Sequence, residues 1–485
     1  MTARIGSKLI RPSWECSVAQ PVKVRFAPSP TGFLHIGGMR SALFNWLYAR
    51  KTNGQFILRL EDTDRERYVP EAVEQIQASH EWLGLLPDET AVQSERLEIY
   101  MQHADKLIKS GQLYRCWCGQ DRLDQLREQA KAHKQAFKYD RYCLTHPQAD
   151  DQPHVLRFLV PDQPATVTWN DAVRGHMEFA IADIDDFVAI KSDGYPTYNF
   201  ANVVDDHVMG ITHVLRAEEF LSSTPKHLLI YAAFSWQPPV FAHLPQVLGP
   251  DGRSKLSKRD GAQSVLEYRD QGYLPEAVIN FMALLGWNEG EGTTKEVYTA
   301  EELIKAFSLE RIHTSPAVFD PERLLWLNGL WIRQQLTEDE LLRRCHDWWP
   351  AAAKPFDNDF KRQVLKLVRD RLKVLSELPE LTGFFFADPA VPPLHQSDQQ
   401  HLSLVAEAIG SFKRSRFTPS ELEAKLRQLA EDLELKPGQL FMPIRQALTG
   451  STVSPGLFET MAVLGRDTCL RRLQAATTRK KFDKR

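Results

Sequence analysis

The sequence has few cysteines, no long apolar run and hardly any net charge, and each shortage excludes a class of protein. Six cysteines among 485 residues are too few to hold so long a chain together by disulfides, and such usage suits a reducing cytoplasm. No apolar stretch approaches the ~18 residues that a transmembrane helix requires. We therefore expect a cytoplasmic protein that has no membrane partner.

The charges nearly balance, with 60 Lys and Arg against 63 Asp and Glu and a formal net charge of -3. A nucleic-acid partner would therefore have to be bound by local basic patches. The basic residues between Arg479 and Arg485 form one such patch, although a solvated tail has the same composition. Residues 1–20 lack the apolar core of a secretory signal, and their basic residues weakly resemble an organellar transit segment.

The order of elements near the N-terminus predicts a parallel sheet. Residues 22–27 have the pattern of a short buried strand, a Pro-Ser-Pro-Thr-Gly turn follows, and residues 37–52 have a helical pattern that leads to a second strand at 56–61. This succession indicates a right-handed crossover, with a ligand bound where the first strand ends. The first strand is not followed by Gly-x-Gly-x-x-Gly and the chain has no Walker A lysine, which argues against a dinucleotide-binding fold and a P-loop.

The pattern of apolar and polar residues changes after about residue 113. Between about residues 114 and 201 short strands and a polar helix are expected, and an apolar strand resumes at 211–217. Beyond Ser264 the pattern is helical almost to the end, with Thr337, Thr418 and Ser454-Pro455 as expected helix starts. The predicted fold is an α/β catalytic domain with a Rossmann-like parallel sheet split by an α+β insertion, followed by all-α domains.

Two separated motifs carry residues suited to phosphate chemistry. His35-Ile-Gly37-Gly38 lies at the start of the first predicted helix, where free N–H groups and the helix dipole favour a phosphate. A simple capping histidine would have the same position. About 220 residues later, Gly252-Arg-Ser-Lys255-Leu-Ser-Lys258-Arg259 could neutralise a transferring phosphoryl group and its leaving group, although a solvated basic loop would look alike.

Together these motifs resemble the HIGH and KMSKS motifs of class I aminoacyl-tRNA synthetases. The surrounding sequence resembles glutamyl-tRNA synthetases in particular, from about residue 22 to 473. The stretches that carry this likeness are the Ala-Pro-Ser-Pro-Thr-Gly before His35, Leu60-Glu61-Asp62-Thr-Asp64-Arg65, Ser192-Asp-Gly-Tyr-Pro-Thr-Tyr198, Asn202-Val-Val-Asp-Asp-His207 and Arg216-Ala-Glu-Glu219. Gly38 stands where the first motif name has a second histidine, and the lysine loop reads Lys-Leu-Ser-Lys-Arg; both forms are familiar in the glutamyl branch.

The resemblance implies a division of the chain into five parts. These are a first catalytic half (22–113), a connective, acceptor-binding insertion (114–201), a second catalytic half with the lysine loop (202–263), a helical stem-contact domain (264–335) and a helical anticodon-binding region (336–485).

The resemblance also implies the reaction: a glutamate–tRNA ligase activates L-glutamate with ATP and Mg²⁺ and transfers it to the 3′-terminal adenosine of tRNA(Glu). Glutamate presents two carboxylates and an ammonium, and arginine forks suit carboxylates well. By resemblance Arg25, Tyr198 and Arg216 bind the side-chain carboxylate, Glu61 binds the ammonium and Ser29 assists. The expected catalytic residues are His35 and Lys258, and the expected ATP-binding residues are His35, Gly37, Gly38, Glu219, Lys255 and Lys258.

The predicted insertion contains a group of soft ligands. Cys116-Trp-Cys118, a distant Cys143 and His146 three positions later would suit a tetrahedral structural zinc site, although buried thiols are an alternative. Relatives that bind zinc often end the set in Cys-x-His, so the fourth ligand stays open between His146 and Tyr139.

In the helical C-terminal part, Arg371 occupies the place where relatives carry an arginine that reads the third anticodon base; a solvated helix side chain would look the same. We expect a monomer that binds tRNA(Glu). The alternatives are a glutaminyl-tRNA synthetase, which would end in β-barrels, a glutamyl-queuosine tRNA synthetase, which would lack the anticodon region, and a non-catalytic tRNA-binding paralogue.

Overall fold

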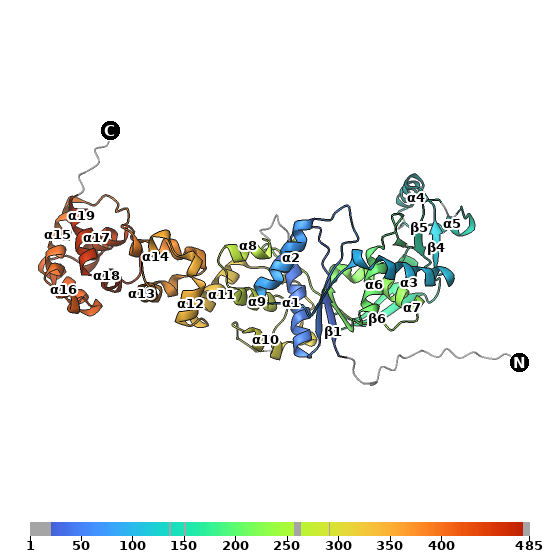
Figure 1. The fold of residues 1–485 in the computed structure, drawn as a ribbon, viewed down its shortest axis with the longest axis horizontal. Coiled ribbons are helices and arrows are strands. Elements are labelled where there is room, and N and C mark those ends of the chain that lie inside the picture. The colour runs from blue at the N-terminus through green and yellow to red at the C-terminus, as the bar shows by residue number, and fades with distance from the viewer. Residues whose placement is uncertain (1–20, 135–136, 150–151, 257–262, 291, 479–485) are drawn as a thin grey trace. The chain divides into compact units, whose positions relative to one another are not determined.

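The computed structural model describes residues 21–134, 137–149, 152–256, 263–290 and 292–478. The chain divides into two compact units, one of residues 1–265 and 282–319 and the other of 266–281 and 320–485 (Figure 1). The expected stem-contact segment, 264–335, is therefore shared between the two units. No helix in the described ranges is both long and apolar enough to cross a membrane.

A parallel sheet forms the centre of the first unit. Strands β1 (Lys23–Phe26), β2 (Gln55–Leu60) and β3 (Glu89–Val92) pair in parallel in that order. Strand β9 (His213–Ala217) pairs in parallel with β10 (Val240–Leu244). Just before β9, Thr212 donates its backbone N–H to the Lys23 carbonyl of β1 at 2.9 Å. The strands predicted at 22–27 and 56–61 and their parallel crossover are confirmed.

The order of these strands decides where a ligand can bind. From β1 the chain continues to β2 and β3 on one side, whereas β9 and β10 lie on the other side. Where successive strands are added first on one side of a parallel sheet and then on the other, a crevice forms at the carboxyl ends of the central strands. Arg25 lies near that end of β1, Glu61 directly follows β2, and Arg216 lies near the end of β9. The topology thus gathers them at one edge.

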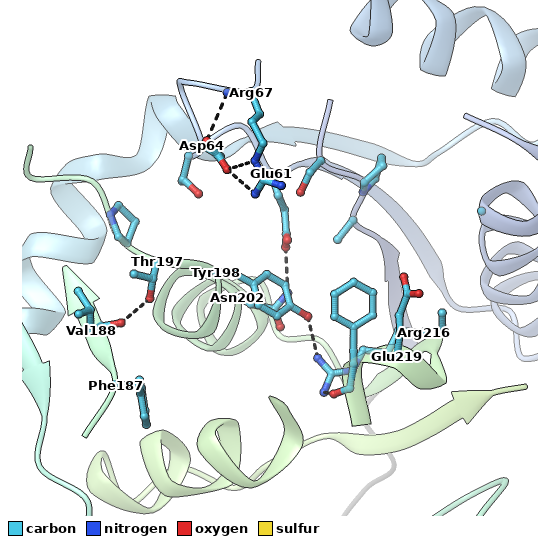
Figure 2. A pocket seen from close by; sticks show the side chains of 18 of the residues that line it. Glu61, Asp64, Arg67, Phe187, Val188, Thr197, Tyr198, Asn202, Arg216 and Glu219 are labelled. Atoms are coloured by element: carbon cyan, nitrogen blue, oxygen red, sulfur yellow. Dashed lines mark hydrogen bonds and ion pairs between the residues drawn. The ribbon is translucent and has the colours of Figure 1, made fainter. Parts of the chain in front are cut away.

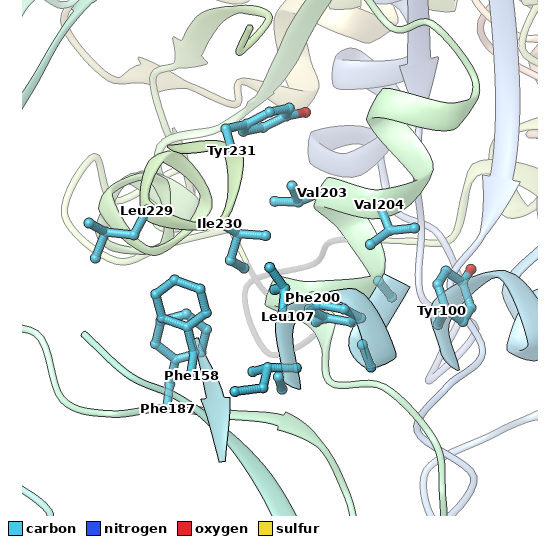
Figure 3. Close-up of a cluster of buried hydrophobic side chains, with 14 of the residues drawn as sticks. Tyr100, Leu107, Phe158, Phe187, Phe200, Val203, Val204, Leu229, Ile230 and Tyr231 are labelled. Carbon is cyan, nitrogen blue, oxygen red and sulfur yellow. The ribbon is translucent and has the colours of Figure 1, made fainter. Parts of the chain in front are cut away.

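A hydrophobic core fixes the helices on this sheet. In Figure 3, side chains of α3 (Leu97–Lys109), α6 (Tyr198–Val208) and α7 (Thr224–Ala233) meet the Phe158 and Phe187 rings of the insertion. Phe200, Val203 and Val204 of α6 are completely buried in this cluster, so the position of α6, which begins at Tyr198, is set by packing. The helices of the first unit outside the insertion are α1 (Ile36–Lys51), α2 (Pro70–Leu83), α3 (Leu97–Lys109), α6 (Tyr198–Val208), α7 (Thr224–Ala233) and α10 (Ala300–Ala306).

The predicted α+β insertion is confirmed. Strands β4 (Leu113–Cys116), β5 (Val155–Phe158) and β8 (Val188–Ile190) form an antiparallel sheet, and β6 (Thr166–Asp171) forms a hairpin with β7 (Gly175–Ala180). The polar helix is α4 (Gln120–Ala132), which buries none of its residues. A single helical turn, α5 (Tyr142–Thr145), follows it.

The second unit is helical throughout its described residues. Its helices are α11 (Pro321–Gln334), α12 (Glu338–Arg344), α13 (Asn358–Val368), α14 (Leu378–Phe386), α15 (Gln396–Gly410), α16 (Pro419–Asp432), α17 (Pro437–Thr449), α18 (Leu457–Leu464) and α19 (Arg466–Thr478), with most of α8 (Val265–Asp270) and α9 (Pro275–Leu284). After Ser264, the one named strand among the described residues is β12 (Ala317–Val318) in the first unit, which pairs with β11 (Val247–Leu248).

Two of the three predicted helix starts in this unit are confirmed. Thr337 caps α12 by accepting from the Glu340 N–H, and Thr418 caps α16 in the same way. The third start was placed too early, since α18 begins at Leu457 and not at Ser454. The reason is Arg445, which donates to the carbonyls of Ser454 at 3.1 Å and Pro455 at 2.8 Å and so holds both outside the helix.

Candidate active site

A cavity of about 1210 Å³ in the first unit collects almost all of the residues expected at the site (Figure 2). It is lined by Arg25, Ser29, His35, Gly37, Gly38, Glu61, Tyr198, Arg216, Glu219 and Lys255, among others. Lys258 lies outside the described residues. Side chains separated by up to 230 positions in the sequence therefore share one space at the crevice that the strand order predicts.

Arg216 is a buried cation whose hydrogen-bond partners are neutral groups. Its side chain is 5% exposed, and burial lowers its pKa. Among the described residues its hydrogen-bond acceptors are all uncharged: His243 Nε2 at 3.1 Å, Tyr198 Oη at 3.0 Å, His227 Nδ1 at 3.3 Å, Thr224 Oγ1 at 2.8 Å and the Phe220 carbonyl at 3.3 Å. A buried guanidinium without an anionic partner favours the binding of an anion in the cavity that it faces.

Arg25, in contrast, already has a carboxylate partner. Its Nε lies 3.0 Å from Oδ1 of Asp206 and its Nη2 lies 3.3 Å from Oδ2. The same Asp206 accepts from Arg59 Nη1 at 2.8 Å. Burial opposes the ionisation of Asp206, but the two arginines outweigh it and lower the pKa of the carboxyl. Arg25 thus has less unbalanced charge to offer than Arg216.

Glu61 brings a partly satisfied carboxylate to the same cavity. Its Oε1 accepts from Arg59 at 3.0 Å and from Asn202 at 2.9 Å, a bond that Figure 2 shows. Burial raises the pKa of Glu61 although Arg59 and Arg25 act in the opposite direction. Among the described residues Oε2 has no hydrogen-bond partner, which leaves an acceptor for a cationic group.

Sequence reasoning assigned no role to Asn202, Asp206 or Arg59, which support the predicted residues. Tyr198, Asn202 and Asp206 are spaced by four residues on α6 and therefore lie on one helix face. That spacing was the signal that could have identified Asn202 and Asp206, whereas Arg59 lies on β2 and has no such signal.

His35 both caps α1 and lines the cavity. It is the N-cap residue, and its Nδ1 accepts from the Gly37 N–H at 3.1 Å. A Cβ on Gly37 would lie 2.9 Å from His35 Cε1, which is closer than real side chains approach. A glycine is therefore required at position 37 to let the imidazole keep this position.

The segment that follows the lysine loop is joined to the first motif through the backbone. The Val265 N–H donates to the Leu34 carbonyl at 3.0 Å, and Ser264 forms a bridge with His35. At the other end of the lysine loop, Lys255 forms a bridge with Leu248 and its ammonium pairs with Glu219. Both flanks of residues 257–262 are thus held at the cavity.

The three thiols expected at a metal site also come together. The sulfurs of Cys116, Cys118 and Cys143 lie within 4.8 Å of one another, and none of these cysteines forms a disulfide. The Tyr139 hydroxyl lies 3.4 Å from Cys116 Sγ and 3.3 Å from Cys118 Sγ. Three soft sulfur atoms and a phenol oxygen, with Cys116, Cys143 and Tyr139 buried, fit the donor set of a tetrahedral zinc ion.

His146 is not brought to this cluster. It is exposed at the end of α5, its ring stacks on Tyr142 with centroids 4.0 Å apart, and its Nδ1 lies 3.1 Å from the Tyr142 carbonyl. The short helical turn that contains Cys143 directs the histidine to the surface, whereas the Tyr139 hydroxyl lies beside the thiols.

Arg371 is exposed at the end of a short 3₁₀ helix, η8 (Arg369–Arg371), in the second unit. Burial, and then the charge of Arg371, lower the pKa of Arg445.

Comparisons with known proteins agree with this geometry. A family described as tRNA synthetases class I (E and Q), catalytic domain, matches residues 21–326, and an anticodon binding domain matches residues 340–477. Similar proteins include the glutamate–tRNA ligases of Dehalococcoides mccartyi, 46% identical over 94% of this chain and 98% of the relative, and of Moorella thermoacetica, 43% identical over 94% and 98%.

A solved structure of a glutamate tRNA ligase is also similar to this chain. A glutamate tRNA ligase from Elizabethkingia meningosepticum, crystallised in complex with its amino acid, matches with a TM-score of 0.85 at 32% identity and covers 94% of this chain and 99% of that one. The chain belongs to the class I tRNA synthetases for E and Q, and within them to the group formed by the glutamate–tRNA ligases.

Proposed function

We propose that this protein is a glutamate–tRNA ligase, which joins L-glutamate to the 3′-terminal adenosine of tRNA(Glu) at the expense of ATP. The observation that carries the proposal is the buried Arg216, which faces the cavity with no carboxylate partner among the described residues. An acidic amino acid supplies the missing anion. The relatives named as glutamate–tRNA ligases support this choice of substrate.

In the proposed complex, the charges of glutamate meet opposite charges around the cavity. The side-chain carboxylate binds Arg216 and the Tyr198 hydroxyl, with Arg25 adding a second guanidinium. The ammonium binds the carboxylate of Glu61, whose Oε2 is the available acceptor, and Ser29 contributes a hydrogen bond. A pocket that balances each charge in this way can desolvate glutamate without leaving an ion unpaired.

ATP is proposed to bind beside the amino acid, with its phosphates at the N-terminus of α1, where Gly37 and Gly38 let a phosphate approach the backbone closely. Glu219, which pairs with Lys255, is assigned to the nucleoside end. When bound, Mg²⁺ would screen the phosphate charge. The α-carboxylate of glutamate attacks the α-phosphorus, pyrophosphate leaves, and glutamyl-adenylate forms. His35 and Lys258 stabilise the developing charge, so catalysis is mainly positioning and electrostatics.

The tRNA is proposed to contact several parts of the chain. Residues 114–201 serve the acceptor end, 264–335 the stem and 336–485 the anticodon, where Arg371 would read a base. A zinc ion held by Cys116, Cys118, Cys143 and Tyr139 would order the insertion. We assign the protein to the cytoplasm as a monomer.

The rival activities find less support. A glutaminyl enzyme would end in β-barrels, whereas the described residues from 320 to 478 contain no strand. A glutamyl-queuosine enzyme would lack the region that matches an anticodon binding domain at 340–477.

The test is ATP–pyrophosphate exchange, measured with glutamate, glutamine and aspartate in the presence and absence of tRNA(Glu). We expect exchange with glutamate alone among the three, and strongest when tRNA is present. Absence of exchange with glutamate in the presence of tRNA(Glu) would leave only a non-catalytic tRNA-binding paralogue.

A further inference from the structure

We propose that Asp171 and His243 are positioning residues for Arg216. They hold one tautomer of the His243 ring, and this tautomer orients the guanidinium toward the amino-acid side chain. The inference rests on the proposed role of Arg216 in binding glutamate. It assigns a task in substrate recognition to a residue of the β6–β7 hairpin, which belongs to the insertion.

The three side chains form a continuous buried row. Asp171 Oδ2 lies 2.5 Å from His243 Nδ1, and His243 Nε2 lies 3.1 Å from Arg216 Nε. His243 and Arg216 are register partners on β10 and β9. The exposed fractions of Asp171, His243 and Arg216 are 3%, 0% and 5%, so water is not available to replace a lost hydrogen bond.

The identity of the neighbours fixes the ring proton. An ionised carboxylate can only accept, so His243 Nδ1 must carry the hydrogen that faces Asp171. Nε2 is then the acceptor that Arg216 requires. The opposite tautomer would place an N–H against the Arg216 Nε–H, with two donors facing one another. Asp171 therefore determines, through the imidazole, whether the guanidinium can lie where it does.

Asp171 is itself firmly held. Its Oδ1 accepts the backbone N–H groups of Val173 at 3.1 Å, Arg174 at 3.1 Å and His243 at 3.0 Å. The adjacent Ala172 N–H donates to the Phe241 carbonyl of β10 at 2.8 Å. Oδ2 is left for the imidazole alone, and the hairpin is tied to the strand that carries His243.

Within the described part of the chain, Oδ1 accepts only backbone N–H groups, and Oδ2 accepts only from His243. The isosteric substitution Asp171→Asn therefore tests the proposal. The amide oxygen can keep the three backbone hydrogen bonds, which leaves the amide nitrogen opposite His243 Nδ1. The ring must then accept at Nδ1 and carry its hydrogen on Nε2, against Arg216. In ATP–pyrophosphate exchange with tRNA(Glu), we expect KM for glutamate to rise roughly 10-fold or more, with KM for ATP nearly unchanged.

A second pair of variants tests His243 without relying on Asp171. His243→Leu removes the acceptor, whereas the side-chain oxygen of His243→Gln can replace Nε2. We expect His243→Leu to raise KM for glutamate as Asp171→Asn does and His243→Gln to recover most of the loss. Because glutamine has no tautomers, adding Asp171→Asn to His243→Gln should raise KM less than about twofold further.

The outcomes separate this inference from the proposed function. An unchanged KM for glutamate in Asp171→Asn would overturn the positioning role. So would a rise in KM on Asp171→Asn that is equally large in the wild-type protein and in the His243→Gln variant. Arg216→Ala, measured in parallel, tests the pocket itself. If Arg216→Ala loses glutamate activation while Asp171→Asn does not, only the inference fails; if Arg216→Ala activates glutamate normally, the proposed pocket fails first.

Discussion

Arg25 and Arg216 face one cavity from the neighbouring strands β1 and β9, but of the two only Arg25 is paired with a carboxylate among the described residues. This asymmetry divides their tasks. Asp206 holds Arg25 rigidly, so that it contributes a fixed but partly balanced charge. Arg216 keeps an unbalanced charge in a buried place, and an acidic side chain gains most by binding there.

The first prediction concerns Arg216→Ala. Loss of a buried bidentate guanidinium should lower kcat/KM for glutamate about 100-fold or more, since hydrogen bonds to charged groups contribute ~1.5–3 kcal/mol each. The affinity for tRNA(Glu), measured by filter binding, should change little because this residue is buried in the cavity. Comparable glutamate activation by the variant would remove Arg216 from the amino-acid site.

The second prediction concerns Gly37→Ala. In an ordinary helix this change stabilises by ~0.5–1 kcal/mol, but here the new Cβ would lie 2.9 Å from the His35 ring and displace it. We expect kcat to fall about 10-fold or more, with a melting temperature close to that of the wild type, because the lost His35 cap offsets the gain in helix propensity. Full activity of the variant would show that the position of His35 does not matter.

The third prediction concerns Asp206→Asn. Breaking the buried pairs with Arg25 and Arg59 should lower the free energy of unfolding by about 3 kcal/mol at pH 7. The folded-state pKa of Asp206 lies below its usual value, so its contribution is fully present above about pH 3.9 and is lost as the pH falls through the folded pKa. The difference between variant and wild type in urea unfolding should therefore shrink on acidification below about pH 4.

A matched control for that experiment is Asp88→Asn. Asp88 also pairs with an arginine, Arg50 at 2.8 Å, but its side chain is 36% exposed, so the expected loss is below ~1 kcal/mol. Equal losses for the two variants would contradict the assigned importance of the buried network.

The fourth prediction concerns the thiol cluster. The purified protein should contain one zinc equivalent, which Cys118→Ser should abolish and Tyr139→Phe should weaken, because these side chains supply ligand atoms. His146→Ala should keep the metal, since its ring faces Tyr142 and not the sulfurs. Elemental analysis after dialysis against a weak chelator measures this. Zinc lost from His146→Ala and retained by Tyr139→Phe would reverse the ligand assignment.

The sequence was informative where function depends on contiguous stretches. The strand, turn and helix around His35 and the residues proposed to bind glutamate were visible as ordered motifs. Partnerships between distant residues were not. Arg25 and Asp206 are 181 positions apart, and Asp171 and His243 are 72 apart, so only the strand order and the hairpin docking bring them together.

The sequence also could not decide between Tyr139 and His146 as the fourth metal ligand, although both lie close to Cys143 in the chain. Both lie within four residues of Cys143, and spacing alone suits either as a ligand. The backbone decides: α5 turns His146 toward solvent, whereas Tyr139 precedes the turn and points to the thiols.

The most direct test of the central claim is aminoacylation of tRNA(Glu) and tRNA(Gln) transcripts by the wild-type protein, with labelled glutamate or labelled glutamine. We predict glutamyl-tRNA(Glu) as the product and no transfer of glutamine to either tRNA, because Arg216 requires an anionic side chain. Transfer of glutamine, or failure to charge tRNA(Glu) with glutamate, would contradict the proposed site.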